Sequence, residues 1–326
     1  MQYLIGVDIG GTNIKLALVG KNARLKDRRI FSTTGFKGRS TLLYGIESQI
    51  EDLILGQGLK KREIMGVGIG VPGAVDIRTG TVHYLTNIPG WREVPLGKIL
   101  RKRLSIPVFI DNDVNVMALG EVYFGSGKGA VNMLCITLGT GVGGGLILDG
   151  KLYRGSSYTA GEFGHIPINI DGPRCKCGSR ACVEAYAGNR YIVKNVSAQS
   201  RSGAKTLITK FVKGDLSKIT PEIISEAERK NDKFAKKVWI DIGEKIGIGL
   251  AGVVNLLNVE KIIIGGGVAA AGKSLFDSIK KTINKRAMQL PAKTARVVKA
   301  RLGYDAGLIG AATLVLYELG RVNASK

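Results

Sequence analysis

Apolar runs that end in glycine-rich turns recur along the chain. In YLIGVDIGGTNIKLALVG an apolar run reaches Asp8, residues 10–12 form a Gly-Gly-Thr turn, and a second apolar run follows. The segment LCITLGTGVGGGLILDG repeats this order about 130 residues later, with Gly139-Thr140 at its turn. Apolar runs interrupted by glycine are typical of strands joined by tight turns. The pattern predicts two copies of one β-hairpin, one in each of two domains.

Helical patterns alternate with further strands in the rest of the chain. VNVMALGEVYFG reads as a helix, and KIIIGGGVAAAG as a strand followed by a glycine loop. A longer helical stretch ends near residue 258, and AGLIGAATLVLYELG predicts a last helix stopped by Gly320. The long stretch has apolar residues near helical spacing at Phe234, Val238, Trp239, Ile242 and Ile246. Strands that alternate with helices predict an α/β fold.

Length and composition agree with a packed protein of two domains. The chain has 326 residues, of which 44% are hydrophobic. Its 48 basic and 26 acidic residues give a net charge of +22, which raises nucleic acid or a membrane surface as partners. The basic residues are scattered, however, and no aromatic residues are interleaved to stack on bases. We therefore expect a solvated basic surface that favours anionic substrates, with neither nucleic acid nor membrane as a partner.

The sequence also predicts a cytoplasmic protein. The N-terminal MQYLIGVDIGG has no basic region or cleavage site, so no signal peptide is expected. Residues 246–259 are mostly apolar, but charged residues bracket them and leave too short a span to cross a bilayer. In a reducing compartment, clustered cysteines more often bind metal or act in catalysis than form disulfides.

Both glycine turns suit phosphate binding. Glycine leaves backbone N–H groups open to phosphate oxygens, and two turns from two domains could face one cleft. Asp8, just before the first turn, could hold Mg²⁺ there, directly or through water. Phosphoryl transfer to a hydroxyl also needs a carboxylate base. FIDNDVN offers Asp111 and Asp113 at a strand-to-helix junction, where such residues also serve simply as helix caps.

A second phosphate motif competes with this interpretation. GVAAAGKS, residues 267–274, satisfies the Walker A pattern between an expected strand and an expected helix. Three observations favour the hairpins as the phosphate-binding sites. The hairpins occur as a pair upstream, the Walker A match lies late in the chain, and no convincing second strand ends in a magnesium-binding aspartate. A P-loop NTPase remains an alternative.

Three of the four cysteines lie within eight residues. Cys175, Cys177 and Cys182 form a Cys3His set with His165, and four such ligands saturate tetrahedral zinc. The expected zinc site is therefore structural, with no open position for a catalytic water. Chance thiols or a disulfide are the alternative. Cys135 lies in an apolar run and is expected to be a buried small hydrophobe.

Several motifs together resemble the ROK family of sugar kinases and sugar-responsive repressors. They are DIGGTN, GVPGAVD, NIPGW, IDNDVN, TLGTGVGGG, AGEFGH, CKCGSRACVE and IIIGGGVAAAG, and they span the chain in the family's order. AGEFGH with the cysteine loop is the most specific part. The resemblance implies a two-lobed actin-like ATPase (ribonuclease-H-like) fold with a nucleotide and sugar cleft between the lobes. The small lobe would be residues 1–113 plus about 305–326, and the large lobe residues 114–304.

The resemblance also implies roles for individual residues. Asp113 matches the catalytic base, which decides between the two aspartates. The sugar ligands would be Asn112, Glu162, His165 and Glu184. The phosphate motifs would be Asp8, Gly10, Gly11 and Thr12, then Gly139, Thr140 and Gly141, with Gly265, Gly266 and Gly267 beside the adenosine. Zinc on His165, Cys175, Cys177 and Cys182 would hold the sugar-binding loop rigid. Ala181 departs from the family, which usually has glycine there.

An ATP-dependent hexose kinase is the expected activity. The family's repressors carry a DNA-binding domain before the first phosphate motif, whereas Asp8 leaves no room for one. Glucose is the first expectation because NIPGW and CKCGSRACVEAY resemble the glucokinase branch. N-acetylmannosamine, N-acetylglucosamine and fructose remain alternatives. The cofactors would be ATP, Mg²⁺ and structural Zn²⁺, and the resemblance suggests a homodimer or homotetramer.

Overall fold

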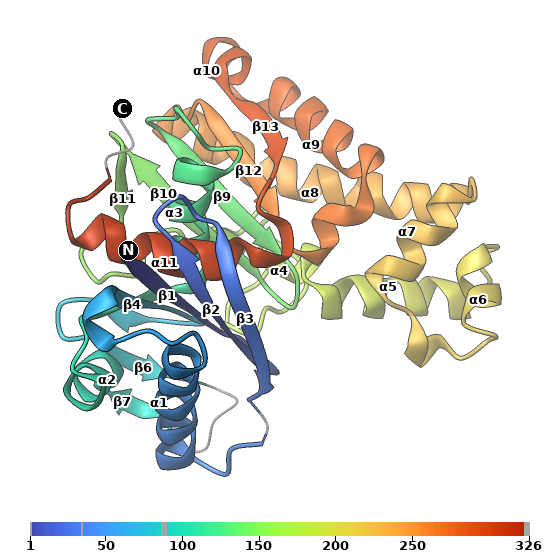
Figure 1. The fold of residues 1–326 in the computed structure, drawn as a ribbon. Coiled ribbons are helices and arrows are strands. Elements are labelled where there is room, and N and C mark those ends of the chain that lie inside the picture. Colours follow the sequence, from blue (N-terminus) through green and yellow to red (C-terminus); the bar gives the residue numbers. More distant parts are fainter. Residues whose placement is uncertain (1, 34, 86–89, 323–326) are drawn as a thin grey trace. The chain divides into compact units, whose positions relative to one another are not determined.

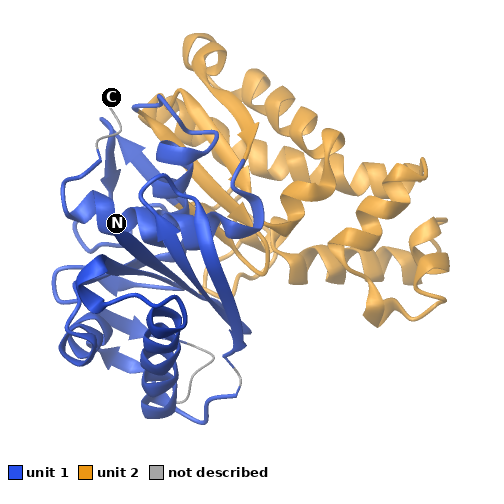
Figure 2. Cartoon of the chain, in the orientation of Figure 1, with its two compact units in different colours: residues 1–131, 145–161, 301–326 blue, residues 132–144, 162–300 orange. Residues whose placement is uncertain are grey.

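The chain folds into two compact units in a computed structural model that describes residues 2–33, 35–85 and 90–322. Unit 1 comprises residues 1–131, 145–161 and 301–326, and unit 2 comprises residues 132–144 and 162–300 (Figure 2). Residues 87–89 of the NIPGW motif lie outside the described residues. Among the described ranges, none of the helices combines the length and hydropathy needed to cross a membrane.

Strands and helices alternate as the sequence predicts (Figure 1). The strands are β1 Tyr3–Ile9, β2 Asn13–Gly20, β3 Leu25–Ser32, β4 Ile64–Val71, β5 Val75–Asp76, β6 Thr81–Tyr84, β7 Arg92–Val94, β8 Val108–Asn112, β9 Met133–Leu138, β10 Val142–Leu148, β11 Lys151–Tyr153, β12 Lys261–Gly265 and β13 Arg296–Lys299. The helices are α1 Arg39–Gly56, α2 Leu96–Leu104, α3 Asp113–Phe124, α4 Glu184–Ala187, α5 Asn189–Arg201, α6 Leu207–Phe211, α7 Pro221–Arg229, α8 Lys233–Leu257, α9 Lys273–Arg286, α10 Gln289–Thr294 and α11 Ala306–Glu318. Short 3-10 helices include Phe163–His165 and Gly267–Ala271.

Unit 1 is built on a five-stranded sheet of order β3-β2-β1-β4-β8. β1 pairs antiparallel with β2 and parallel with β4, and β4 pairs parallel with β8. Successive side chains of a strand point to opposite faces. Ile5 and Val7 of β1 accordingly belong to the core formed with α1 and α2, whereas Leu4 packs with α11. The sheet is thus covered by helices on both faces.

Glycines let α11 approach the backbone of this sheet. A Cβ on Gly6 of β1 or Gly68 of β4 would run into the backbone carbonyls of Leu308 and Ala311. The face of the sheet toward α11 therefore requires glycine at both positions.

Helix α3 packs against α11 within unit 1. A Cβ on Gly120 would lie 3.0 Å from Cα of Gly310, so the two helices meet at small residues. The predicted boundary between the lobes, after residue 113, separates α3 from this partner. The compact units instead keep residues 114–131 and 145–161 with unit 1. One of the places where the chain passes from one unit to the other lies within β10, after Gly144.

Unit 2 combines a parallel strand set with a long helix pair. β12 pairs parallel with both β9 and β13. Helices α8 and α9 pack closely, because Gly243 and Gly247 of α8 leave room for Ser278 and Thr282 of α9. The predicted long helix is confirmed, and it ends at Leu257 with Val238, Trp239, Ile242 and Ile246 buried. The predicted last helix is also confirmed, followed by Gly320 at φ 63°.

Candidate functional site

The first glycine turn joins β1 to β2 and is held by a buried threonine. Gly10 N donates to Asn13 O at 2.9 Å, and Thr33 N donates to Thr12 O at 2.8 Å. The Thr33 hydroxyl also donates to Gly10 O at 3.0 Å. Thr33 is 2% exposed, whereas Gly11 and Thr12 are exposed. The fold therefore fixes the base of the turn and presents its tip, as a phosphate-binding turn requires.

Asp8 lies at the end of β1 in a poorly solvated position. Its carboxylate is 3.7 Å from Lys15 Nζ and contacts Gly307 in the first turn of α11, where a Cβ would lie 2.6 Å from Oδ2. Burial raises the pKa of Asp8, and the opposing effect of Lys15 only partly offsets this. A carboxylate is the ligand type that Mg²⁺ prefers, so Asp8 could hold that ion. Without a cation, its ionised form costs folding free energy.

We expect Asp8→Asn to raise the melting temperature at neutral pH while lowering kcat/KM about 100-fold or more. The folded-state pKa of Asp8 lies above the unfolded value, so ionised Asp8 reduces stability as pH rises through the folded pKa. The amide removes that charge. Thermal unfolding without Mg²⁺, at pH 7.5 and below pH 4, checks this: the gain should disappear in acid, where both proteins carry a neutral group. A lower melting temperature at pH 7.5 would contradict it.

The junction of β8 and α3 gives the neighbouring aspartates different environments. Asp111 is 1% exposed, and both of its oxygens are engaged, Oδ2 by Arg154 Nε at 2.7 Å and Oδ1 by Asn115 Nδ2 at 2.8 Å. Asp113 is the first residue of α3 and is half-buried. Asp111 is therefore committed to the fold, which leaves Asp113 as the carboxylate of this junction that a substrate could reach.

Asn112 caps α3, as the capping interpretation predicts for this junction. Its Oδ1 accepts from Val114 N at 2.8 Å and from Asn115 N at 3.3 Å. Its Nδ2 donates to Gly73 O at 3.1 Å. An amide nitrogen carries two hydrogens. One N–H of Asn112 thus holds the junction, and the amide nitrogen carries a second hydrogen.

The second glycine turn joins β9 to β10 and contacts a predicted sugar ligand. Val142 N donates to Glu184 Oε2 at 2.9 Å, and Asn189 N donates to Gly139 O at 2.9 Å. A Cβ on Gly141 would lie 2.6 Å from the same Oε2 atom, so a larger residue there would displace the Glu184 carboxylate. The structure thus brings Glu184, which begins α4, against residues 139–142.

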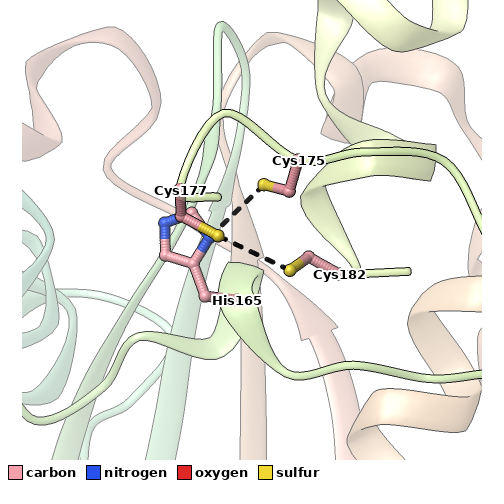
Figure 3. A group of neighbouring side chains, drawn as sticks. All are labelled: His165, Cys175, Cys177 and Cys182. Atoms are coloured by element: carbon pink, nitrogen blue, oxygen red, sulfur yellow. Dashed lines mark hydrogen bonds between the residues drawn. The ribbon is translucent and has the colours of Figure 1, made fainter. Parts of the chain in front are cut away.

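The four predicted zinc ligands converge in unit 2 (Figure 3). Their ligand atoms all lie within 4.8 Å of one another. Cys177 Sγ and Cys182 Sγ are 3.7 Å apart, and Cys175 Sγ is 3.7 Å from His165 Nδ1. Sulfurs at about 2.3 Å from a tetrahedral zinc are separated by about 3.8 Å. The residues therefore fit zinc in both type and spacing, and the sulfurs are too far apart for a disulfide.

The loop controls the ionisation of the thiols. Burial raises the pKa of Cys182 to about 12, whereas the backbone N–H of Ser179 lowers the pKa of Cys177. Gly178 turns the loop between them at φ 94°. A thiolate is the form that binds metal, so a bound cation would have to stabilise the Cys182 thiolate that burial disfavours.

His165 has one ring nitrogen toward the cysteines and one toward Glu162. Its Nε2 lies 3.9 Å from Glu162 Oε2, which is beyond hydrogen-bonding range. Both side chains are partly exposed, at 34% and 58%. A hydroxyl placed between them could bond to both. The arrangement therefore suits the double role, in zinc and sugar binding, that the sequence predicts for His165.

Ala181 adopts the left-handed conformation that the family's glycine would suit. Its φ is 53°, and its side chain is fully buried against Gly172. An alanine there costs about 1 kcal/mol or more of backbone strain. Its N–H nevertheless donates to Pro173 O at 3.0 Å, and its carbonyl accepts from Ile168 N at 2.9 Å. The loop keeps its geometry despite the substitution.

We expect Ala181→Gly to change the free energy of unfolding by less than about 0.5 kcal/mol, because relief of strain offsets the loss of a buried methyl worth about 0.8 kcal/mol. Ala251→Gly is the matched control. Ala251 is also buried, but it lies inside α8, where glycine costs about 1 kcal/mol in addition to the lost methyl. Urea unfolding of both variants checks the difference. Equal destabilisation would show that Ala181 is unstrained.

The glycine loop after β12 differs from an open phosphate loop. Gly266 has φ 85°, and a Cβ there would meet the backbone of Leu138. Residues 267–271 form a 3-10 helix whose Val268 and Ala269 are buried. These contacts disfavour the P-loop alternative. The backbone of a P-loop must wrap around phosphate, whereas residues 266–271 pack against their own unit.

A cavity of about 550 Å³ lies elsewhere in unit 2, between α5, α8 and the cysteine loop. Tyr191, Phe234 and Lys245 are among its lining residues. It contains none of the predicted site residues, so we do not assign the predicted phosphoryl transfer to it.

The predicted residues are divided between the units: Asp8, residues 10–12, Asn112 and Asp113 lie in unit 1, and the others lie in unit 2.

Comparison with known proteins identifies similar sequences and folds. The model of the ROK family matches residues 4–318. A glucokinase of Halalkalibacterium halodurans is 36% identical over 319 residues, covering 96% of this chain and 95% of that protein. A solved ROK family glucokinase from Streptomyces griseus, in complex with glucose and AMPPNP, has a TM-score of 0.81 at 36% identity, covering 96% and 98%. A solved ROK family transcriptional regulator has a TM-score of 0.88 at 27% identity, covering 97% of this chain and 79% of its own.

Proposed function

The chain belongs to the ROK family, and on that premise we propose that it is an ATP-dependent hexose kinase whose sugar is glucose. The observation that carries this proposal is the division of roles at the β8–α3 junction. Asp111 is buried and bound to Arg154, whereas Asp113, the first residue of α3, is only half-buried. The similarity in fold to a regulator does not separate the two activities, and the higher identity to the glucokinase supports the kinase.

In the proposed reaction Asp113 accepts the proton of the sugar 6-hydroxyl as its oxygen attacks the γ-phosphorus of ATP. The new O–P bond forms while the bond from that phosphorus to the ADP oxygen breaks. The N–H groups of the two glycine turns would stabilise the charge on the transferring phosphoryl group. Asp8 would hold Mg²⁺, which neutralises phosphate charge when bound. The products are ADP and the hexose 6-phosphate.

Hydrogen bonds from four side chains would bind the sugar. Asn112 offers its remaining N–H, and Glu184 has acceptor capacity beyond the bond from Val142. Glu162 and His165 would share a hydroxyl between them. Zinc on His165 and the three cysteines would hold these groups in fixed positions. The proposed location is the cytoplasm, where ATP and reduced thiols are available, and the expected assembly is a homodimer or homotetramer.

A coupled ADP-release assay with Mg²⁺ and ATP tests the proposal. The sugars are glucose, N-acetylmannosamine, N-acetylglucosamine, mannose and fructose. Turnover highest on glucose supports it, and turnover highest on another sugar keeps the kinase but corrects the substrate. No turnover on any sugar, with ATP hydrolysis that is lost in Lys273→Ala, would overturn it in favour of a P-loop enzyme.

A further inference from the structure

We infer that Arg154 is a positioning residue for the base Asp113, acting through the buried carboxylate of Asp111. Arg154 follows directly after β11, and its side chain is 13% exposed. The inference rests on the proposed function, because it assigns Arg154 a part in the same reaction.

The guanidinium of Arg154 binds two carboxylates that lie in different directions from it. Its Nε donates to Asp111 Oδ2 at 2.7 Å, and its second terminal nitrogen donates to Glu318 Oε1 at 2.6 Å. Although burial by itself lowers the pKa of Arg154, Asp111 and Glu318 raise it above its ordinary value. The planar, branched guanidinium makes this pair of bonds possible, and an ammonium group at the same site could not reproduce their geometry.

Asp111 transmits this restraint to both sides of the base. Its Oδ1 accepts from Asn112 N at 2.7 Å and from Asn115 Nδ2 at 2.8 Å. These partners lie in the strand end and in the first turn of α3, on either side of Asp113. A carboxylate with all three bonds fixes the direction in which α3 leaves β8. Without Arg154 the buried charge of Asp111 would be uncompensated, and this junction would have to rearrange.

Arg154 also connects the junction to the far end of α11. Glu318 is the last residue of that helix, and the guanidinium lies 5.6 Å from the ring centre of the adjacent Tyr317. The Tyr317 hydroxyl accepts from Leu152 N at 3.1 Å, which fixes β11 on the same helix. Arg154 is thus held by a rigid support and is not a mobile surface side chain.

Arg154→Lys and Asp111→Asn test the inference, with Arg103→Lys as the matched control. Arg103 also pairs with a carboxylate in unit 1, that of Glu47 at 2.9 Å, but on the surface of α2. We expect both junction variants to lower kcat about ten- to hundredfold with less than a twofold change in KM for sugar. The acid limb of the kcat–pH profile reports the pKa of the base in the enzyme–substrate complex, and this limb should shift in both variants. The double variant should be no worse than the worse single one.

A purely structural role gives a different result. The melting temperature would fall while kcat of the folded protein and its pH profile match those of Arg103→Lys, and this would overturn the inference. Hydrogen exchange of the peptide covering residues 111–117 gives a readout independent of catalysis. Faster exchange in Arg154→Lys shows that Arg154 restrains the β8–α3 junction, even if the wild type phosphorylates none of the sugars, a result that would contradict the proposed function alone. Unchanged exchange would contradict the inference whatever the activity.

Discussion

Asp113→Asn is expected to lower kcat about 1,000-fold, within the range of about 100 to 10,000 that a general base contributes. The amide has almost the same shape but cannot accept the sugar hydroxyl proton. Because Asp113 lies in the first turn of α3, loss of its charge should also cost about 0.3 to 1 kcal/mol of helix stabilisation. The melting temperature should therefore fall only slightly, and KM for sugar should remain within a few-fold of the wild type.

The coupled assay at saturating ATP and sugar measures this effect. Asp52→Asn is a matched control, since Asp52 is an exposed aspartate within α1 of the same unit. Its kcat should match that of the wild type. A loss of less than tenfold in Asp113→Asn would show that another group accepts the proton.

Loss of one zinc ligand is expected to have the largest effect on stability. Cys182→Ser should reduce the zinc content from about one per chain to nearly none and lower the melting temperature by about 10 °C or more, because structural zinc contributes several kcal/mol to folding. KM for sugar should rise, since His165 and the segment leading to Glu184 lose their common anchor. Chelation of zinc from the wild type should reproduce both changes.

Cys135→Ser is the matched control for this experiment. Cys135 and Cys182 are both fully buried, but only Cys182 belongs to the converging set. Metal analysis after dialysis should find zinc retained in Cys135→Ser. Cys177→Ser adds a ligand variant at an exposed position, where the substitution itself perturbs packing little. A zinc content that is equally low in the wild type and all three variants would contradict the zinc site.

The sequence predicts local elements well because their causes are local. Gly11-Thr12 and Gly139-Thr140 mark tight turns between apolar runs, and both lie between strands in the structure. The spacing of apolar residues in α8 similarly predicts that this segment is a helix, and the helix ends at Leu257, close to the predicted end. The cysteine cluster was also predictable, since three of its four ligands are close in sequence.

The contacts that the sequence does not predict are those between residues that lie far apart along the chain. The sequence alone offers Asp111 and Asp113 as equals, because the arginine that engages Asp111 lies 43 positions away. Thr33, which holds the first turn, lies 23 positions from Gly10 and carries no signal of that contact. Gly120 of α3 meets Gly310 of α11, a contact that no local pattern reveals.

The packing of α11 on Gly6 and Gly68 determines the order in which the two units can fold during synthesis. β1 is synthesised before α11, the helix that covers its second face, and almost three hundred residues separate the two. The uninterrupted segment 162–300 of unit 2 is complete before that helix exists. Domains fold as their chain emerges. Unit 2 should therefore acquire its structure first, while the sheet of unit 1 keeps an apolar face uncovered until α11 has been synthesised.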